Sequence, residues 1–109
     1  MLASVGMPAN SRGQIKGCIV DGPLGFDNAI SLEAAKHKGI KSEVAGYADI
    51  LIMPDLASGN ILDKAMRYFA EFKTAGVVAG AKVPLIMTSR SDSAENKLNS
   101  IIVSVLQAV

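Results

Sequence analysis

Short apolar runs bounded by turn residues recur along this chain and predict β-strands. The clearest is Ala48–Met53 (Ala-Asp-Ile-Leu-Ile-Met), which ends at Pro54. Such a near-continuous apolar run is typical of a parallel strand that is covered on both faces. Similar runs predict strands over residues 17–21 and 84–88, and Gly76–Gly80 is either a further strand or a tight crossover.

Segments with helical spacing of their apolar positions lie between and after these runs. The first covers residues 27–38 and is stopped by Gly39. The second follows a loop at residues 55–60 and reaches about residue 72, and the last runs from about residue 91 to the end. An apolar stripe in the last helix comprises Ala94, Leu98, Ile101, Ile102, Val105 and Val109.

The alternation of strands and helices predicts an α/β fold with a parallel sheet and right-handed crossovers. Residues 1–13 carry little pattern and are expected to form a weakly ordered start. Ligands of such folds bind at the carboxyl ends of the strands. Polar loops follow predicted strands at residues 21–27, 55–60 and 89–95, and these loops are the candidate sites.

Composition narrows the class of protein. Half of the 109 residues are hydrophobic and 19% are charged, which argues against disorder. The net charge of +1 implies no broad basic face for nucleic acid, although a local anion pocket stays open. No run approaches the roughly 18 apolar residues of a membrane helix, and Met1–Gly6 lacks the features of a signal peptide. The single cysteine, Cys18, is expected to be a buried small hydrophobe in a cytoplasmic protein.

The strongest lead to function is the junction Met87–Glu95, where a strand is predicted to end and a helix to begin. The start of a helix attracts anions through its free N–H groups and its dipole. Ser89 with Asp92, or Asp92 with Glu95, also has the spacing of a capping box, which would need no further role. Arg90 weakens that alternative, because a cation opposes the helix dipole unless an anion binds nearby.

The two other loops allow both structural and functional interpretations. Ser58 or Asn60 can cap the following helix; alternatively, Gly59 lets a ligand approach the backbone while Asp55 and Asn60 present polar groups. Asp21 lies in a turn and is a candidate for holding either a loop or a substrate group. A metal site has no support, since the only histidine, His37, is far from Cys18.

These motifs together resemble the phosphate acyltransferases, with phosphate butyryltransferase as the nearest type and phosphate acetyltransferase as a wider relative. The resemblance covers roughly residues 11–109. It rests on Val20–Leu24, Asp27–Ser31, Ala48–Asp55, Ser58–Asn60 and Thr88–Ser93.

The resemblance implies reversible transfer of a short-chain acyl group, butyryl or acetyl, between CoA and inorganic phosphate, giving an acyl phosphate. CoA and phosphate would be substrates, with no further cofactor and no metal. Members are much longer, dimerise, and form two α/β domains of the isocitrate dehydrogenase-like fold with the site in the cleft. Residues 14–109 would be a C-terminal portion with a three-layer parallel sheet, and residues 84–109 would return to the first domain.

Carried over from the family, Ser89 hydrogen-bonds the reacting centre and Arg90 pairs with anionic CoA or phosphate oxygens, as a guanidinium does well. The acid that takes the thiol proton in the acetyltransferase branch corresponds to Asn96, which cannot be a base. Glu95 is the preferred substitute, with Asp92 as the other candidate. Asp21, Asp55, Gly59 and Asn60 are the expected substrate-binding residues.

Two other functions stay open at this stage. One is a non-catalytic α/β module that binds CoA or another anion, or that serves in assembly. The short length of the chain favours this alternative. The other is a flavodoxin-like or response-regulator domain, which lacks the acidic cluster or flavin loop it would need.

Overall fold

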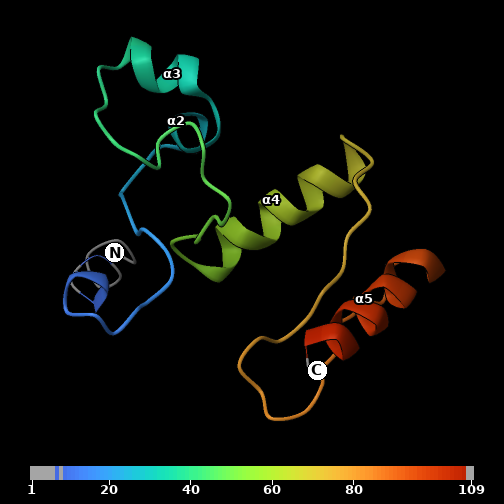
Figure 1. Ribbon diagram of the computed structural model, residues 1–109. Coiled ribbons are helices and arrows are strands. Elements are labelled where there is room, and N and C mark those ends of the chain that lie inside the picture. Colours follow the sequence, from blue (N-terminus) through green and yellow to red (C-terminus); the bar gives the residue numbers. More distant parts are fainter. Residues whose placement is uncertain (1–6, 8, 108–109) are drawn as a thin grey trace. The chain divides into compact units, whose positions relative to one another are not determined.

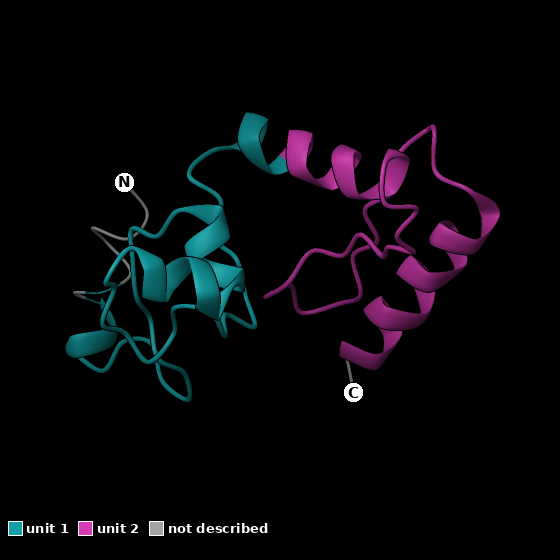
Figure 2. Cartoon of the chain, turned by 90° about the horizontal axis from the view of Figure 1, so that it is seen from above, with its two compact units in different colours: residues 1–59 teal, residues 60–109 magenta. Residues whose placement is uncertain are grey.

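The computed structural model of the chain describes residue 7 and residues 9–107. The chain divides into two compact units, residues 1–59 and residues 60–109 (Figure 2). Much of the predicted weakly ordered start, residues 1–13, lies outside the described residues. The predicted domain boundary near residue 84 stays a prediction.

Unit 1 contains two short helices, α2 (Phe26–Ile30) and α3 (Leu32–His37), which are labelled in Figure 1. The prediction of one helix over residues 27–38 is wrong, because Ser31 interrupts it with an extended backbone (φ −122°, ψ 113°). The Ser31 hydroxyl accepts the Ala34 N–H at 3.3 Å and so caps α3. A serine at this position satisfies one of the N–H groups that the break exposes.

A close turn around Gly46 completes unit 1. The Gly46 N–H donates to the Asn28 carbonyl at 2.8 Å, and the Ala48 N–H donates to the Ala29 carbonyl at 3.1 Å. Gly46 has a φ of 88°, and a Cβ there would lie 2.5 Å from the Leu32 Cα. Glycine is therefore required where this turn meets the start of α3. Among the described residues of the unit, the buried apolar ones are the alanines 29, 35 and 45.

Helix α4 (Leu56–Tyr68) begins earlier than predicted and ends earlier. The Asp55 carboxylate accepts the Ser58 N–H at 2.7 Å, so Asp55 is the residue that caps the helix. The predicted loop at residues 55–60 is therefore wrong beyond Asp55, since Ser58 and Asn60 lie inside the first turns. The helix stops four residues before Phe72, and Glu71 then takes a left-handed backbone (φ 54°).

Unit 2 contains helix α5 (Ala94–Gln107) and an extended hairpin before it. Ser93, whose hydroxyl accepts the Asn96 N–H at 3.1 Å, sets the start of α5 three residues after the predicted one. Val77 and Ile86 form an antiparallel bridge in the hairpin. The buried residues of α5 are Ser100, which accepts the Gly76 N–H at 2.9 Å, and Ser104, which donates to the Leu85 carbonyl at 3.4 Å.

The predicted parallel sheet does not form within the described residues, where that antiparallel bridge is the only strand pairing. Residues 17–21 and 48–53 are irregular and pair with no strand in the described part of the chain, and Gly76–Gly80 and 84–88 pair only through the bridge. A helix satisfies its own backbone groups, whereas a strand needs a neighbour. The strand predictions are therefore wrong for the chain by itself, while helices do form in each of the three regions predicted to be helical.

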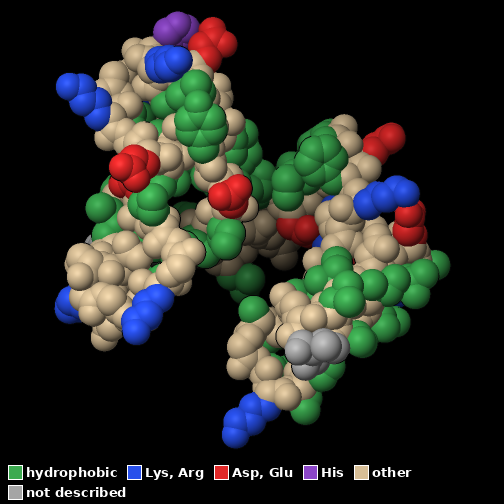
Figure 3. All heavy atoms as spheres, viewed as in Figure 1, with side chains coloured by type: hydrophobic (Ala, Val, Ile, Leu, Met, Phe, Trp, Pro, Cys, Tyr) green, Lys and Arg blue, Asp and Glu red, His purple; other side chains and the backbone are tan. Residues whose placement is uncertain are grey.

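Many large apolar side chains remain exposed, as the green surface in Figure 3 shows. Ile50 and Ile52 of the predicted strand Ala48–Met53 are 75% and 70% exposed, and Leu98 and Val105 of the α5 stripe are 55% and 50% exposed. Cys18, predicted to be buried, is exposed for the same reason: its segment has no covering layer. None of the helices in the described part of the chain is long and apolar enough to cross a membrane.

Candidate active site

The junction before α5 is a tight polar turn built around the side chain of Asp92. One carboxylate oxygen accepts the Ser89 N–H at 2.6 Å, and the Asp92 N–H donates back to the Ser89 carbonyl at 3.1 Å. The side chain of Asp92 is only 4% exposed. The predicted Ser89–Asp92 pairing is thus present, but it closes the turn that precedes the helix, and Ser93 caps the helix itself.

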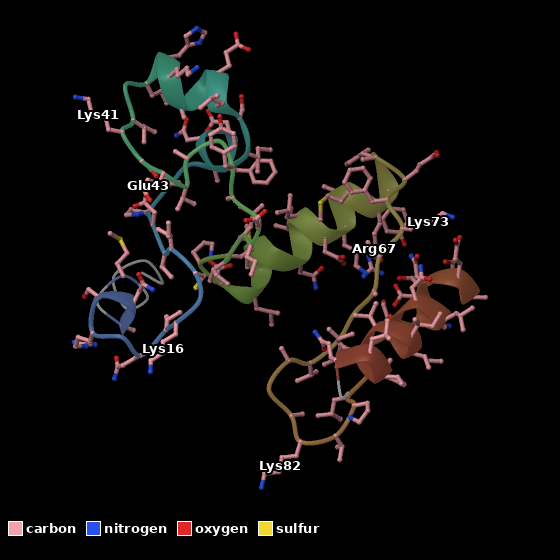
Figure 4. The ribbon with its side chains drawn as sticks, in the orientation of Figure 1. Lys16, Lys41, Glu43, Arg67, Lys73 and Lys82 are labelled. Carbon is pink, nitrogen blue, oxygen red and sulfur yellow. The ribbon has the colours of Figure 1, made fainter. Side chains whose placement is uncertain are left out.

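The other oxygen of Asp92 accepts a hydrogen bond from the guanidinium of Arg67, which comes from α4. Arg67 also donates through Nε to Asp63 at 2.8 Å, one turn earlier on α4. Figure 4 labels Arg67 on the side of α4 that faces the start of α5. The Arg67 side chain is only 16% exposed, so its ion pairs with the two carboxylates are largely shielded from water.

The Ser89 hydroxyl contacts Ser91 and takes no part in the Asp92 bonds. The two hydroxyl oxygens are 3.1 Å apart, and the Ser91 N–H donates to the Ser89 hydroxyl at 3.4 Å. Arg90, between them, is exposed, and within the described residues no carboxylate forms an ion pair with it. The turn therefore carries a hydroxyl and, at the next residue, an exposed guanidinium that has no carboxylate partner among the described residues.

Glu95 and Asn96 occupy the first turn of α5 and have different surroundings. Glu95 pairs with Lys73 at 2.6 Å, where both side chains are more than half exposed, and this carboxylate raises the pKa of Lys73. The Asn96 side-chain oxygen accepts the Thr74 N–H at 3.2 Å. Asn96 thus anchors the chain after α4, and Glu95 is the accessible carboxylate of the two predicted bases.

A hollow of about 320 Å³ lies beside this turn, within unit 2. Its volume is at the lower end of those of ligand pockets. The end of α4, the chain that follows it and the start of α5 line it, with aromatic, charged and polar side chains. These lining residues are Arg67, Tyr68, Glu71, Phe72, Lys73, Ser91, Asp92, Ser93, Glu95 and Asn96.

The predicted substrate residue Asp21 lies in unit 1 and holds a loop there. One oxygen accepts the Gly22 N–H at 2.7 Å and the other accepts the Ser42 hydroxyl. Ser42 in turn accepts the N–H groups of Val44 and Ala45, each at 3.0 Å. Of the two roles that the sequence left open for Asp21, the loop-holding role is the one with contacts in the structure.

The structure brings Asp55 and Gly59 together in the first turn of α4, with Asn60 following. The Gly59 N–H donates to the Asp55 carbonyl at 3.2 Å, and a Cβ on Gly59 would lie 3.6 Å from the Met53 side chain. The Ser58 N–H, followed by the Ser58 hydroxyl, holds the pKa of Asp55 below its usual value. Asn60 is exposed. A substrate role for these residues stays a prediction.

Arg67 is the site residue that the sequence did not single out. Its pairing with Asp63 was readable as an i,i+4 charge pair on a helix. Its pairing with Asp92, twenty-five positions away, had no local signal. The same holds for Lys73, which meets Glu95 only once the chain has turned back after α4.

The Asp92 contacts make an acid-dependent contribution to stability. The Ser89 N–H, and with a smaller effect the charge of Arg67, hold the pKa of Asp92 below its usual value despite the opposing effect of burial. A carboxyl group whose pKa is lower in the folded state stabilises that state above its unfolded pKa of about 3.9. This stabilisation is lost as the pH falls through the lower, folded value.

We therefore expect Asp92→Asn to lower the free energy of unfolding at pH 7 and to differ less from the unsubstituted protein near pH 3. Urea denaturation at the two pH values measures the difference. Asp27→Asn is the matched control, since the Asp27–Lys38 pair in unit 1 is exposed and such pairs contribute little. An Asp92→Asn effect that is equal at both pH values would contradict this expectation.

Comparison with known proteins decides the family. The profile of the family described as phosphate acetyl/butaryl transferase matches residues 9–105. This chain belongs to the phosphate acetyl/butaryl transferase family. The residues of the junction and of the three predicted loops all lie within the matched range.

Named relatives and a solved structure agree with this assignment. A phosphate acetyltransferase of Thermotoga maritima is 55% identical over 99% of this chain and 37% of its own length. A probable phosphate butyryltransferase of Bacillus subtilis is 58% identical over 86% of this chain and 31% of its own length. The crystal structure of a branched-chain phosphotransacylase from Enterococcus faecalis superimposes with a TM-score of 0.70 at 42% identity, covering 81% of this chain and 33% of that one.

The chain thus spans about a third of the length of the curated relatives it matches. Its likeness to the phosphotransacylase supports the α/β class. The family assignment that the motifs suggested is confirmed.

Proposed function

We propose that this chain supplies part of the active site of a phosphate acyltransferase. The reaction is the reversible transfer of a short-chain acyl group, butyryl or acetyl, between CoA and inorganic phosphate, and it gives an acyl phosphate. The observation that carries the proposal is the Ser89–Arg90 turn, which presents a hydroxyl and a guanidinium within a family match of residues 9–105.

The state of the arginines supports Arg90 as the anion-binding residue. Arg67 is bound by two carboxylates, and Arg12 donates to the Gln14 side chain at 3.4 Å. Arg90 alone among them is exposed next to the start of a long helix without a carboxylate on it in the described structure. A guanidinium there can form two parallel hydrogen bonds with a phosphate group of CoA or with inorganic phosphate.

The proposed chemistry assigns Ser89 to the reacting carbonyl and Glu95 to the CoA thiol. The tetrahedral oxyanion needs donors, which the Ser89 hydroxyl and Arg90 can provide. The thiol, with a pKa of about 8.5, must lose its proton before it attacks acyl phosphate. Glu95 is the better base, because both oxygens of the buried Asp92 already accept hydrogen bonds, whereas Glu95 is exposed and pairs with Lys73 through one oxygen.

The complete site is proposed to need the rest of an acyltransferase subunit. The apolar segments 17–21 and 48–53 are suited to become parallel strands of a three-layer α/β fold once partner strands are present. Residues 76–80 and 84–88 meet in an antiparallel hairpin, so only one of these two segments can run parallel to them. The exposed apolar stripe of α5 is suited to pack against another apolar surface, and we include a homodimer in the proposal. Asp21, Asp55, Gly59 and Asn60 would line the substrate cleft. We place this enzyme in the cytoplasm, acting on small molecules without nucleic acid, membrane, metal or cofactor.

Isothermal titration with CoA, butyryl-CoA and phosphate tests the proposal. We expect CoA and butyryl-CoA to bind and to raise the thermal unfolding temperature. Binding of phosphate alone, with none of CoA, would favour a general anion-binding module instead. Absence of binding by all three would overturn the assignment of the turn.

The 109-residue chain alone is expected to have little or no transferase activity, because only three arginines are available to it and one of these is held by two carboxylates. The assay is release of CoA thiol from butyryl-CoA in the presence of phosphate. Robust turnover by the chain alone would contradict this expectation, whereas CoA binding without turnover would support it.

A further inference from the structure

We propose that Arg67 is a positioning residue for the site: through the carboxylate of Asp92 it fixes the backbone of Ser89 and so aims the Ser89 hydroxyl and the Arg90 guanidinium. This inference rests on the proposed function and adds to it a residue from a different helix. It also reassigns Asp92 from candidate base to the link between Arg67 and the turn.

The contacts form a continuous chain of hydrogen bonds. Arg67 donates to one oxygen of Asp92, and the other oxygen accepts the Ser89 N–H at 2.6 Å. The Asp92 N–H returns to the Ser89 carbonyl at 3.1 Å, so the peptide groups on both sides of Ser89 are held. A carboxylate that uses both oxygens in this way orients its partners in two directions.

Burial makes the arrangement rigid. The side chains of Asp92 and Arg67 are 4% and 16% exposed, so water competes poorly for these bonds. Asp63 holds the other side of the guanidinium at 2.8 Å and fixes its plane. The comparable pair of Lys73 and Glu95 is 72% and 55% exposed and lacks this support.

The Ser89 hydroxyl and the Arg90 guanidinium take no part in the bonds of this network. The Ser89 hydroxyl contacts Ser91 and takes no part in the Asp92 bonds. Arg90 is exposed. The buried bonds thus act on the backbone alone, which is what a group that orients reacting side chains must do.

The test must separate positioning from simple stabilisation. Arg67→Ala leaves a nearly buried carboxylate unpaired and is prone to misfold. The decisive variant is therefore Arg67→Met with Asp92→Leu, because replacing a buried ion pair by apolar residues of similar volume often preserves stability. This double variant keeps the packing but removes the acceptor for the Ser89 N–H. Arg67→Lys, which keeps the charge without the fork, tests rescue.

Two readouts are followed on the 109-residue chain. The first is hydrogen exchange of the Ser89 amide, which should be about tenfold faster in the double variant while the α5 amides keep their protection. The second readout is CoA affinity, which should fall by about tenfold in the folded double variant. The affinity of Arg67→Lys should lie between those of the double variant and the unsubstituted chain. Asp27→Asn, an exposed pair in unit 1, should change neither.

The outcomes distinguish this inference from the proposed function. Failure of the unsubstituted chain to bind CoA counts against the proposed function, and the exchange measurement still tests the positioning network. Unchanged Ser89 exchange in a folded double variant overturns the network. Faster exchange with unchanged CoA affinity overturns the positioning role and leaves Arg67 as a residue of stability alone.

Discussion

Replacing Arg90 by alanine will weaken CoA binding by about ten- to a hundredfold, the range expected for the loss of charge-assisted hydrogen bonds. The reason is the position of Arg90 in the turn before α5, exposed and without a carboxylate partner in the described structure. Removing it takes away the cation without leaving a buried group unpaired. The protein should therefore keep its thermal stability while losing affinity.

Isothermal titration of CoA into Arg90→Ala, Arg90→Lys and Lys82→Ala makes this comparison specific. Arg90→Lys retains the charge but not the planar fork, so its affinity should be intermediate. Lys82→Ala removes another exposed cation, from the loop of the unit 2 hairpin, and should leave affinity unchanged. If Arg90→Ala binds CoA as tightly as the unsubstituted protein, Arg90 does not bind the substrate.

Gly46→Ala will destabilise unit 1 by about 3 kcal/mol, combining backbone strain with overpacking. The φ of 88° is unfavourable for any residue with a Cβ, and that Cβ would lie 2.5 Å from the Cα and 2.7 Å from the N of Leu32. Backbone atoms at the start of α3 cannot move aside as a flexible side chain can. The turn that carries the hydrogen bonds to Asn28 and Ala29 must therefore open.

Gly39→Ala is the matched control for Gly46→Ala. Gly39 also has a positive φ, 65°, but a Cβ there meets nothing within 4 Å. It should cost only the strain, about 1 kcal/mol. Urea denaturation followed by the amide signals of Ala29 and Ala48 reports on unit 1 directly. Equal effects of the two substitutions would show that the approach to Leu32 does not limit the turn.

The polar network around the candidate site shows how far local reasoning reaches. The pairing of Ser89 with Asp92 was predictable, because their separation is that of a known local motif. Ser93 caps α5, but the neighbouring serines and Asp92 are also capping residue types. Sequence spacing alone does not indicate which of them caps the helix. The capping role of Asp55 was missed for the same reason, since aspartate, serine and asparagine all cap helices and Asp55, Ser58 and Asn60 all follow Met53.

The predicted sheet failed for a different reason. The run Ala48–Met53 has the composition of a buried central strand, yet its Ile50 is 75% exposed here. The apolar composition of a segment indicates that it is suited to a buried position. A strand forms there only if neighbouring strands pair with it and other layers cover it. Similarly, α5 buries Ser100 and Ser104 while its apolar stripe is exposed, so the stripe is available to other partners.

The sequence by itself determined the family, the helical segments and the presence of a hydroxyl and a guanidinium in the turn before the last helix. These features depend on local order, because helices satisfy their own backbone groups and a motif is a run of neighbours. Only the tertiary structure decided that Arg67 of α4 bonds Asp92, that Asn96 anchors Thr74, and that Arg90 is left as the exposed arginine of the turn. Such contacts join residues far apart in the chain, and no local pattern specifies which of several charged side chains will meet.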